Sequence, residues 1–302
     1  MRQIRLGTFS PSVLLEVARV TGRLDAAGLA VVELPVTSSP QQFADLFDGR
    51  LDAGLTNPDN VFAYRFVQEN PLGRTGDVRI LAALDRGLGL ALFTGPGREQ
   101  VEDIRGGTVG VDVRGSGFAF VAFELLARAG LRADEDYRVE AFGATPRRVR
   151  ALLSGACVAT VLNAGSDLVA EDAGARRRSP VTELGPYVGS VLTATGMGVE
   201  RNRDALRDLA SVLVATARHI LRTPAPAEVS TAIAERLGLT GDAVERHLAI
   251  LRDSATGLVG DGRLRMVELE TVIELRRAHA RGECPDAVAA LAGGLLDETF
   301  LS

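Results

Sequence analysis

One segment of this chain occurs twice, and the duplication limits the folds available to it. Residues 32–57 and residues 139–163 align with a single-residue gap, and the segments in front, residues 4–29 and 109–131, also correspond. The matched positions include Pro40 and Pro146, Leu46 and Leu152, Gly49 and Gly155, and Asn57 and Asn163. A repeat longer than a solenoid unit predicts two similar lobes. Two lobes that face each other across a cleft suit the binding of a small molecule.

Composition sets wide limits around this prediction. At 302 residues the chain is long enough for two domains, and its net charge of -5 is modest. Basic residues are neither in excess nor interleaved with aromatic ones, so no nucleic-acid partner is expected. The run Arg176-Arg177-Arg178 is short and is expected in a solvated loop. No apolar stretch approaches the ~20 residues that span a bilayer, so no membrane-spanning segment is expected.

Several kinds of chemistry lack their usual residues. The chain contains no lysine, which excludes Schiff-base and pyridoxal-phosphate chemistry and a Walker-type phosphate loop. Cys157 and Cys284 have no metal-ligand spacing, and Cys157 is expected in the core. All three histidines, His219, His247 and His279, fall in the C-terminal region, outside the expected cleft loops. No catalytic residue, metal site or cofactor is therefore predicted.

Strand-like and helix-like segments alternate through both copies of the repeat. Strands are predicted at residues 4–7, 29–34 and 51–55 of the first copy, and at residues 138–142 and 157–162 of the second. Further strands are predicted at residues 78–84, 88–93 and 188–195, and every segment after Arg201 has a helical pattern. This order predicts an α/β protein with parallel or mixed sheets and extra C-terminal helices.

The position of the second copy predicts a discontinuous first domain. Lobe one would comprise residues 1–88 and 190–302, and lobe two residues 89–189. The two crossing segments, near residues 88–93 and 188–194, would form a hinge, since a few backbone angles there can close two lobes. We expect the C-terminal helices to pack onto lobe one.

Polar residues follow the predicted strands in pairs, one from each copy. Ligands of open α/β sheets gather at the carboxyl ends of strands, and the helix N-termini that follow favour anions. The candidate ligand-binding residues in these loops are Ser10, Ser38, Ser39, Thr56, Asn57, Ser116, Thr145 and Asn163. Each serine or threonine has the alternative role of capping its helix. As a set, they predict a polar ring around the cleft, with Asn57 opposite Asn163 and Ser39 opposite Thr145.

Three further candidates lie beside this ring. Phe9 follows the first strand and is a candidate to stack on an apolar or aromatic ligand, or else to pack under its loop. Arg114 has the geometry to clamp an anion, with an ordinary surface position as the alternative. Asp59 follows a strand and is a candidate partner of a ligand amine, or a turn residue. Arg114 and Asp59 have no charged counterpart in the other copy, so we expect them to decide the ligand's identity.

The chain resembles the type II periplasmic-binding-protein fold. The segments that carry the resemblance are IRLGTFSPS, GLAVVELPVTSSPQQFADLFDGRLDAGLTNPDN, IRGGTVGVDVRGSGFAFVAFELLARAGL and the tail TGLVGDGRLRMVELETVIELR. They are most similar to the nitrate/sulfonate/taurine-binding and thiamine-pyrimidine-synthase-like superfamily. The resemblance implies two α/β lobes with mixed sheets, a ligand cleft between them, and contacts from the loops named above. Two features of related proteins are missing: Asn163 stands where many sulfonate binders have tryptophan, and the pyrimidine synthases' reactive histidine and cysteine-rich motif are absent.

Three functions fit this fold. The favoured one is a solute-binding protein that delivers a small organic anion or heterocycle to an ABC permease. The first alternative is a cytoplasmic enzyme on the same scaffold, a decarboxylase, dehydratase or cyclase that acts on a carboxylated molecule. The second is a cytoplasmic ligand sensor. Location depends on the start of the chain: cytoplasmic if Met1 is native, extracytoplasmic if a signal peptide preceded it.

Overall fold

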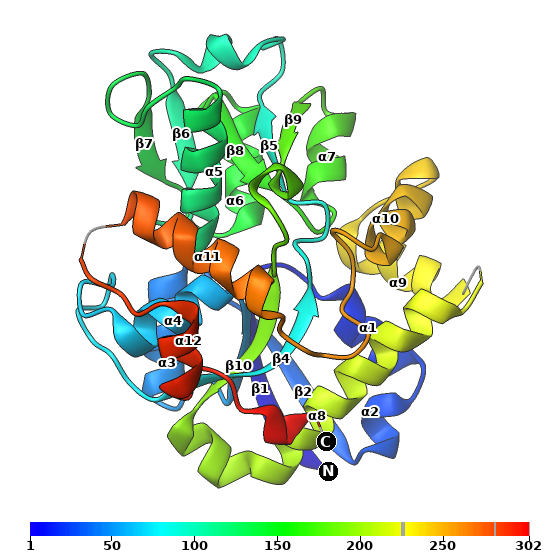
Figure 1. Ribbon diagram of the computed structural model, residues 1–302. Coiled ribbons are helices and arrows are strands. Elements are labelled where there is room, and N and C mark those ends of the chain that lie inside the picture. The colour runs from blue at the N-terminus through cyan, green and yellow to red at the C-terminus, as the bar shows by residue number, and fades with distance from the viewer. Residues whose placement is uncertain (225–226, 281, 302) are drawn as a thin grey trace.

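The computed structural model describes residues 1–224, 227–280 and 282–301, which form two lobes stacked one above the other (Figure 1). The lower sheet has the order β2-β1-β3-β10-β4. Its strands are β1 (Arg2–Thr8), β2 (Leu29–Pro35), β3 (Ala53–Thr56), β4 (Val78–Asp85) and β10 (Ser190–Thr195). The helices between them are α1 (Val13–Val20), α2 (Arg23–Ala26), α3 (Ser39–Phe47) and α4 (Pro58–Phe66). Strand β1 is parallel to β2 and β3, whereas β10 is antiparallel to both its neighbours.

The upper sheet repeats this plan with the order β7-β6-β8-β5-β9. Its strands are β5 (Ala91–Thr94), β6 (Thr108–Val111), β7 (Arg138–Ala141), β8 (Ala159–Leu162) and β9 (Arg176–Pro180). Its helices are α5 (Gly117–Arg128), α6 (Thr145–Leu153) and α7 (Ser166–Asp172), with the 3-10 turns η1 (Val101–Ile104) and η2 (Val181–Leu184). Strand β5 is antiparallel to β8 and β9 and so takes the place that β10 has below. The fold class expected from the duplication, α/β with mixed sheets, is confirmed.

The chain passes between the lobes twice, at residues 86–90 and 181–189. These segments join β4 to β5 and β9 to β10, close to the crossings expected from the sequence. The domain boundaries at residues 88/89 and 189/190 remain a prediction. The arginine run at 176–178 is not a solvated loop: it forms most of the edge strand β9, where Arg178 Nε donates to Thr94 Oγ1 at 3.0 Å.

The C-terminal third is helical and lies along both lobes. It contains α8 (Gly196–Arg222), α9 (Ala227–Leu237), α10 (Asp242–Arg252), α11 (Met266–His279), α12 (Ala287–Ala292) and the turn η3 (Glu298–Phe300). Helices α8 and α9 pack against lobe one, while α11 crosses between the lobes and also touches α5 of lobe two (Figure 1). There His279 Nε2 lies 2.9 Å from Glu124 Oε2. Helix α11 packs on α4 of lobe one as expected, and it contacts lobe two in addition.

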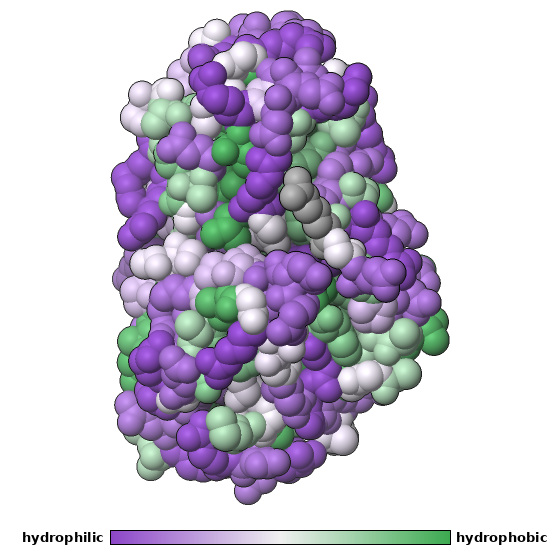
Figure 2. All heavy atoms as spheres, turned by 90° about the vertical axis from the view of Figure 1, so that its left-hand side faces the viewer, coloured by the Kyte–Doolittle hydropathy of each residue, from purple (hydrophilic) through white to green (hydrophobic). Residues whose placement is uncertain are grey.

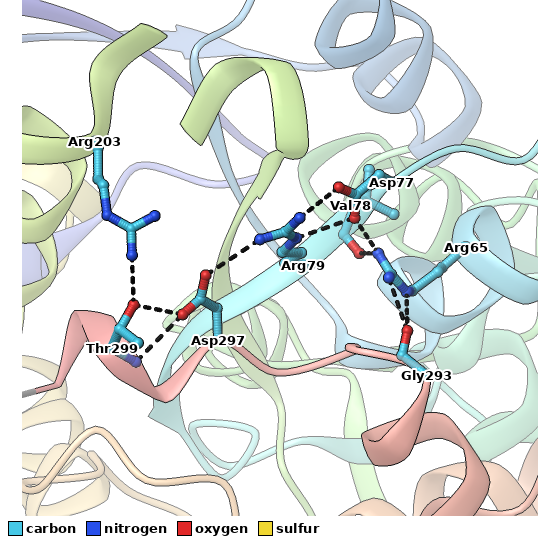
Figure 3. A network of polar contacts seen from close by, with 8 residues as sticks. All are labelled: Arg65, Asp77, Val78, Arg79, Arg203, Gly293, Asp297 and Thr299. Carbon is cyan, nitrogen blue, oxygen red and sulfur yellow. Dashed lines mark hydrogen bonds and ion pairs between the residues drawn. The ribbon is translucent and has the colours of Figure 1, made fainter. Parts of the chain in front are cut away.

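Ion pairs and carbonyl contacts fasten the end of the chain to lobe one (Figure 3). Arg65 Nη2 donates to Gly293 O at 2.8 Å, and Arg79 Nη1 reaches Asp297 Oδ2 at 3.4 Å. Arg79 and Arg65 together lower the pKa of Asp77 to about 2. On the free side of β4, the edge strand of the lower sheet, Ile80 N donates to Leu295 O at 2.7 Å and Asp297 N donates to Ile80 O at 2.9 Å.

The face of the molecule at the left of Figure 1 is mostly hydrophilic, with hydrophobic residues in small separate patches (Figure 2). Large exposed hydrophobic side chains are scattered along the described chain, among them Val20, Met197 and Val288. Such isolated positions are ordinary for a globular surface. Of the helices in the described part of the chain, none is both long and apolar enough to cross a membrane.

Candidate functional site

A cavity of about 150 Å³ lies between the two lobes. The carboxyl ends of β1, β3, β6 and β8 meet there, as the topology of facing α/β sheets predicts. The crossing segments contribute Leu88 and Gly189, and the adjoining strand ends contribute Asp85 and Ser190. One wall comes from the C-terminal region through His247, Leu251 and Leu258. Residues of lobe one, lobe two and the C-terminal region therefore enclose this cavity together.

Seven of the predicted residues line this cavity, and four do not. The lining residues are Phe9, Ser10, Thr56, Asn57, Ser116, Thr145 and Asn163. Ser38, Ser39, Asp59 and Arg114 lie outside it. The structure thus brings together the strand-end residues of both repeats, while their roles toward a ligand remain a prediction.

The two serines outside the cavity act on helix α3. Ser38 is its N-cap, and the Ser38 hydroxyl accepts from Gln41 N at 3.4 Å. Ser39 is buried, and its backbone N–H donates to Asp112 Oδ2 of lobe two at 3.2 Å. The capping alternative therefore describes Ser38, and Ser39 belongs to a contact between the lobes.

The two unmatched charged residues are held by other residues of the protein. Arg114 forms an exposed ion pair with Asp134, so the surface alternative holds for it. Asp59 is 1 % exposed and accepts from Arg276 Nε at 2.6 Å and from Arg276 Nη2 at 2.8 Å. Arg276 Nη2 also donates to Gly115 O of lobe two at 3.1 Å. The expectation that Arg114 and Asp59 decide the ligand's identity therefore has no support in their geometry.

The cation of the cavity is instead Arg148, on the first turn of α6. Its side chain is buried, with Nη1 donating to Val161 O at 2.8 Å and Nη2 to Thr145 Oγ1 at 2.8 Å. It forms no ion pair with any residue that the structure describes, and its Nε has no hydrogen-bond partner. Burial lowers the pKa of Arg148 to about 10, which still leaves the guanidinium charged at neutral pH.

The repeat explains why Arg148 has this conformation. The offset that places Pro40 on Pro146 also places Gln42 on Arg148 and Leu55 on Val161. In lobe one, Gln42 Nε2 donates to Leu55 O at 3.1 Å, just as Arg148 donates to Val161 O in lobe two. The same helix position thus holds the third strand in both lobes, and only the lobe-two version carries a charge. The alignment of the two repeats already places the uncharged Gln42 on Arg148, and this difference in charge could have identified Arg148 from the sequence.

Two more polar side chains of lobe two line the cavity with unused hydrogen-bonding atoms. Asp112 follows β6, and while Asp112 Oδ2 accepts from Ser39 N, Oδ1 has no partner. Burial raises the pKa of the Asp112 carboxyl. Ser116 is the N-cap of α5, but its buried hydroxyl makes no capping hydrogen bond. Buried polar groups are normally satisfied, so these two unpartnered atoms are exceptions among the residues that line the cavity.

His247 on α10 completes this set and corrects the sequence analysis. The expectation that every histidine lies away from the cleft is wrong, because the buried His247 ring lines the cavity and its Nδ1 has no partner. Burial lowers the pKa of His247 to about 4, so the imidazole is neutral at pH 7. No local pattern placed α10 beside the cleft, since its position depends on packing distant in sequence.

The two equivalent asparagines hold the crossing segments. Asn57 Nδ2 donates to Gly189 O at 3.2 Å and to Tyr187 Oη at 2.8 Å. Asn163 Nδ2 donates to Gly87 O at 2.9 Å. Each repeat therefore uses the residue after its third strand to bind one crossing segment, and both residues border the cavity while doing so. A ligand that contacts either asparagine therefore contacts a residue bonded to a crossing segment.

In the ranges that the structure describes, no group of three His, Cys, Asp or Glu side chains is placed to hold a metal ion. Cys157 is buried in lobe two, away from the cavity lining, and burial raises the pKa of its thiol to about 11. Cys157 and Cys284 are both free cysteines.

Comparison with known proteins identifies the fold. No family model and no curated protein matches the sequence. Among solved structures, the alkanesulfonate-binding protein SsuA from Xanthomonas axonopodis pv. citri, bound to MOPS, superposes with a TM-score of 0.70 at 18 % identity, over 99 % of this chain and 96 % of that one. The ligand-binding component of an ABC-type import system from Staphylococcus aureus, with zinc bound, has a TM-score of 0.75 at 12 % identity, over 100 % and 98 %.

An enzyme has the same architecture. The desulfurization enzyme DSZB has a TM-score of 0.63 at 16 % identity, over 100 % of this chain and 98 % of that one. At such identities the likeness is one of fold. The chain thus has the two-lobed type II periplasmic-binding-protein fold, and the fold that the sequence resemblance implied is confirmed. Because binding proteins and an enzyme both have this fold, its function has to be argued from the site.

Proposed function

We propose that this chain is a solute-binding protein of the ABC-importer type, which holds a small organic anion in the cavity between its lobes. The observation that carries the proposal is Arg148, a buried guanidinium that lines the cavity without an ion-pair partner among the described residues. A buried charge without a counter-ion is costly, so an anion bound beside it recovers that free energy. Two of the structural neighbours named above, the alkanesulfonate-binding protein and the ligand-binding component of an import system, support this role without identifying the ligand.

The remaining lining describes the rest of the molecule. Phe9, Leu14, Leu55 and Leu88 give the lobe-one side an apolar surface, and Leu251 and Leu258 extend it. A ligand with an apolar body next to these residues and its charged group toward Arg148 buries both parts in suitable surroundings. Small carboxylates and sulfonates with a short aliphatic or aromatic body therefore fit better than a bare inorganic anion.

The test compares two arginine variants. In Arg148→Gln the new side chain copies Gln42 of lobe one and can still donate to the strand carbonyl, so the fold should survive. Arg114→Gln is the matched control, because Arg114 is exposed and away from the cavity. Binding of small carboxylates and sulfonates would be found by thermal shift and quantified by calorimetry. A charge-assisted hydrogen bond contributes about 1.5–3 kcal/mol, so Arg148→Gln should weaken binding roughly 10- to 150-fold.

Two results would contradict the proposal. One is that Arg148→Gln and Arg114→Gln bind the same anions with equal affinity. The other is that no carboxylate or sulfonate stabilises the wild-type protein. Circular dichroism of both variants distinguishes lost binding from lost folding.

An ABC permease is the partner that this role implies, and an extracytoplasmic location goes with it. The DNA around the gene tests both points. Adjacent permease and ATPase genes, and a signal or lipoprotein segment encoded upstream of Met1, are expected. A biosynthetic gene cluster without transport genes would favour the alternative below.

The alternative is an enzyme on the same scaffold, and His247 is the observation that favours it. A neutral imidazole in the cavity can accept a proton, and Asp85 lies in the same lining. Burial raises the pKa of Asp85 to about 6, so it exchanges a proton near neutrality. Mass spectrometry of a bound compound after prolonged incubation separates the two functions: a binding protein returns it unchanged, and an enzyme returns a product.

A further inference from the structure

The loops that follow the second strand of each repeat meet across the cleft. Ala144 N of lobe two donates to Thr37 O of lobe one at 3.0 Å. Beside this bond, Ser39 N of lobe one donates to Asp112 Oδ2 of lobe two at 3.2 Å. Ala144 and Asp112 both line the cavity, so this first contact between the lobes forms part of the cavity's edge.

Helix α11 makes a second contact between the lobes. The buried Arg276, which is paired with a lobe-one carboxylate, also donates from Nη2 to Gly115 O of lobe two at 3.1 Å. Its guanidinium carbon lies 5.0 Å from the centre of the Phe120 ring on α5. At the end of α11, the His279 ring stacks on Phe120 and its Nε2 lies 2.9 Å from Glu124 Oε2. One helix therefore binds both lobes through charged and aromatic side chains.

Helices α9 and α10 make a third contact. Helix α9 packs on α1 of lobe one, and α10 packs on α9. From α10, Arg246 forms an ion pair with Glu171 on α7 of lobe two. From α9, the Leu237 side chain lies so close to Gly165 of lobe two that a Cβ there would be 2.6 Å from Leu237 Cδ1. Because α10 also supplies a wall of the cavity, this contact borders the cavity too.

Two glycines fit the lobes to each other. A Cβ at Gly117, the first residue of α5, would lie 2.5 Å from Asn57 Oδ1 and 2.7 Å from Asp59 Cβ of lobe one. A Cβ at Gly143 would lie 2.6 Å from Thr37 O, although its φ of +78° also favours glycine. Glycine is otherwise unfavourable in a helix, so the approach of lobe one gives the physical reason for Gly117. The sequence is therefore fitted to lobes that touch.

We propose that the closed arrangement of the lobes is the resting state of this protein, and that these three contacts, rather than a ligand, hold it. Each contact joins protein to protein and is complete without a third molecule. Opening the cleft about the crossing segments has to separate the lobes where these contacts lie. The proposal goes beyond the proposed function and is independent of which molecule binds.

The test measures the distance between the lobes in protein free of small molecules. The chain is dialysed from urea, its refolding is checked by circular dichroism, and native mass spectrometry verifies the mass of the chain alone. Spin labels are placed at two exposed positions, Val20→Cys on α1 and Val169→Cys on α7, in a Cys284→Ser background. Double electron–electron resonance should give one distance, which matches the structure. A longer or broad distribution in the otherwise unchanged protein would overturn the proposal.

Two variants should open the cleft. Ala144 has φ -56° and ψ 154°, which proline adopts, so Ala144→Pro keeps this backbone. It replaces the N–H that faces Thr37 O with a ring carbon, and a longer distance should become the main population. His279→Ala removes the contacts with α5 and should raise the open population about 2- to 10-fold, as one lost hydrogen bond predicts. His219→Ala is the matched control, because its partner Glu228 lies on α9 and not in lobe two.

The second variant keeps the test decisive if Ala144→Pro does not fold. Distances in the folded variants that equal the wild-type distance would overturn the role of these contacts. The same result follows if His219→Ala opens the cleft as far as His279→Ala. X-ray scattering of the unlabelled proteins checks each outcome, since an open cleft increases the radius of gyration.

Discussion

The ion pair of Asp59 with Arg276 makes the sharpest prediction about stability. Asp59→Ala leaves the Arg276 guanidinium, 4 % exposed, with Gly115 O as its one remaining hydrogen-bond acceptor among the described residues. Burial alone would lower the pKa of Arg276, but the Asp59 carboxylate outweighs it and raises that pKa, so the guanidinium is charged when folded. Removing one partner of such a pair costs about 3–5 kcal/mol. Because Arg276 also touches lobe two, the loss should weaken the join between the lobes.

Urea denaturation followed by circular dichroism measures this loss, with Asp134→Ala as the control. Asp134 also pairs with an arginine, but its side chain is 60 % exposed, and such surface pairs contribute about 0–1 kcal/mol. In a thermal melt, the melting temperature of Asp59→Ala should be lower by roughly 6–20 °C, at about 2–4 °C per kcal/mol for a chain of this size. Equal stability of the two variants, or a separate early transition of one lobe in the wild type, would refute the reasoning.

Three further predictions follow from the same structure. Gly117→Ala places a Cβ 2.5 Å from Asn57 Oδ1 and should hold the lobes apart, which X-ray scattering would detect as a larger radius of gyration. Gly115→Ala is the control, because its Cβ comes no nearer than 3.9 Å to Pro71. Equal radii for the two variants would count against a close lobe contact here. The pKa of Asp85, raised by burial from 3.8 to about 6, means that the folded state binds more protons than the unfolded state in this range, so its contribution to stability falls as pH rises from about 4 to 6 and stays lost above it. Asp85→Asn should remove that slope in urea titrations at several pH values, and an unchanged slope would contradict the assignment. Cys157, 1 % exposed with its pKa raised to about 11, should resist alkylation at pH 8 in the native protein and react only after unfolding, as mass spectrometry can show.

The sequence predicted the architecture well because the chain carries the pattern that indicates it twice. The alternation of strands and helices occurs in both copies, and residues at the ends of equivalent strands had to meet at one edge. The register of the front segments was two residues off. Leu6 lies beside Ala53 and Val109 beside Ala159, so Leu6 corresponds to Val109 rather than to Val111. Local similarity alone does not fix such a register when the loops differ in length.

The errors at the site have physical causes of two kinds. The predicted site residues lie in loops or at helix starts, whereas Arg148 is in the first turn of a helix and reaches the strand end through the length of its side chain. In the alignment of the two repeats, Arg148 falls on the uncharged Gln42, so the sequence itself shows the difference in charge. His247 could not be placed in this way, because α10 reaches the cavity only through packing between segments distant in sequence. Asp59 looked like a free charge because its partner, Arg276, is 217 residues away along the chain.

The central claim, that Arg148 binds the charged group of the ligand, can be observed directly by NMR. In protein labelled with ¹⁵N at arginine Nε, the resonance that Arg148→Gln removes is that of Arg148. Adding the tightest-binding carboxylate or sulfonate should shift this resonance and slow the exchange of its N–H proton with water, while the Arg114 resonance stays in place. The account would be contradicted by a ligand that binds the wild-type protein and the Arg148→Gln variant with the same affinity and leaves the Arg148 resonance unmoved.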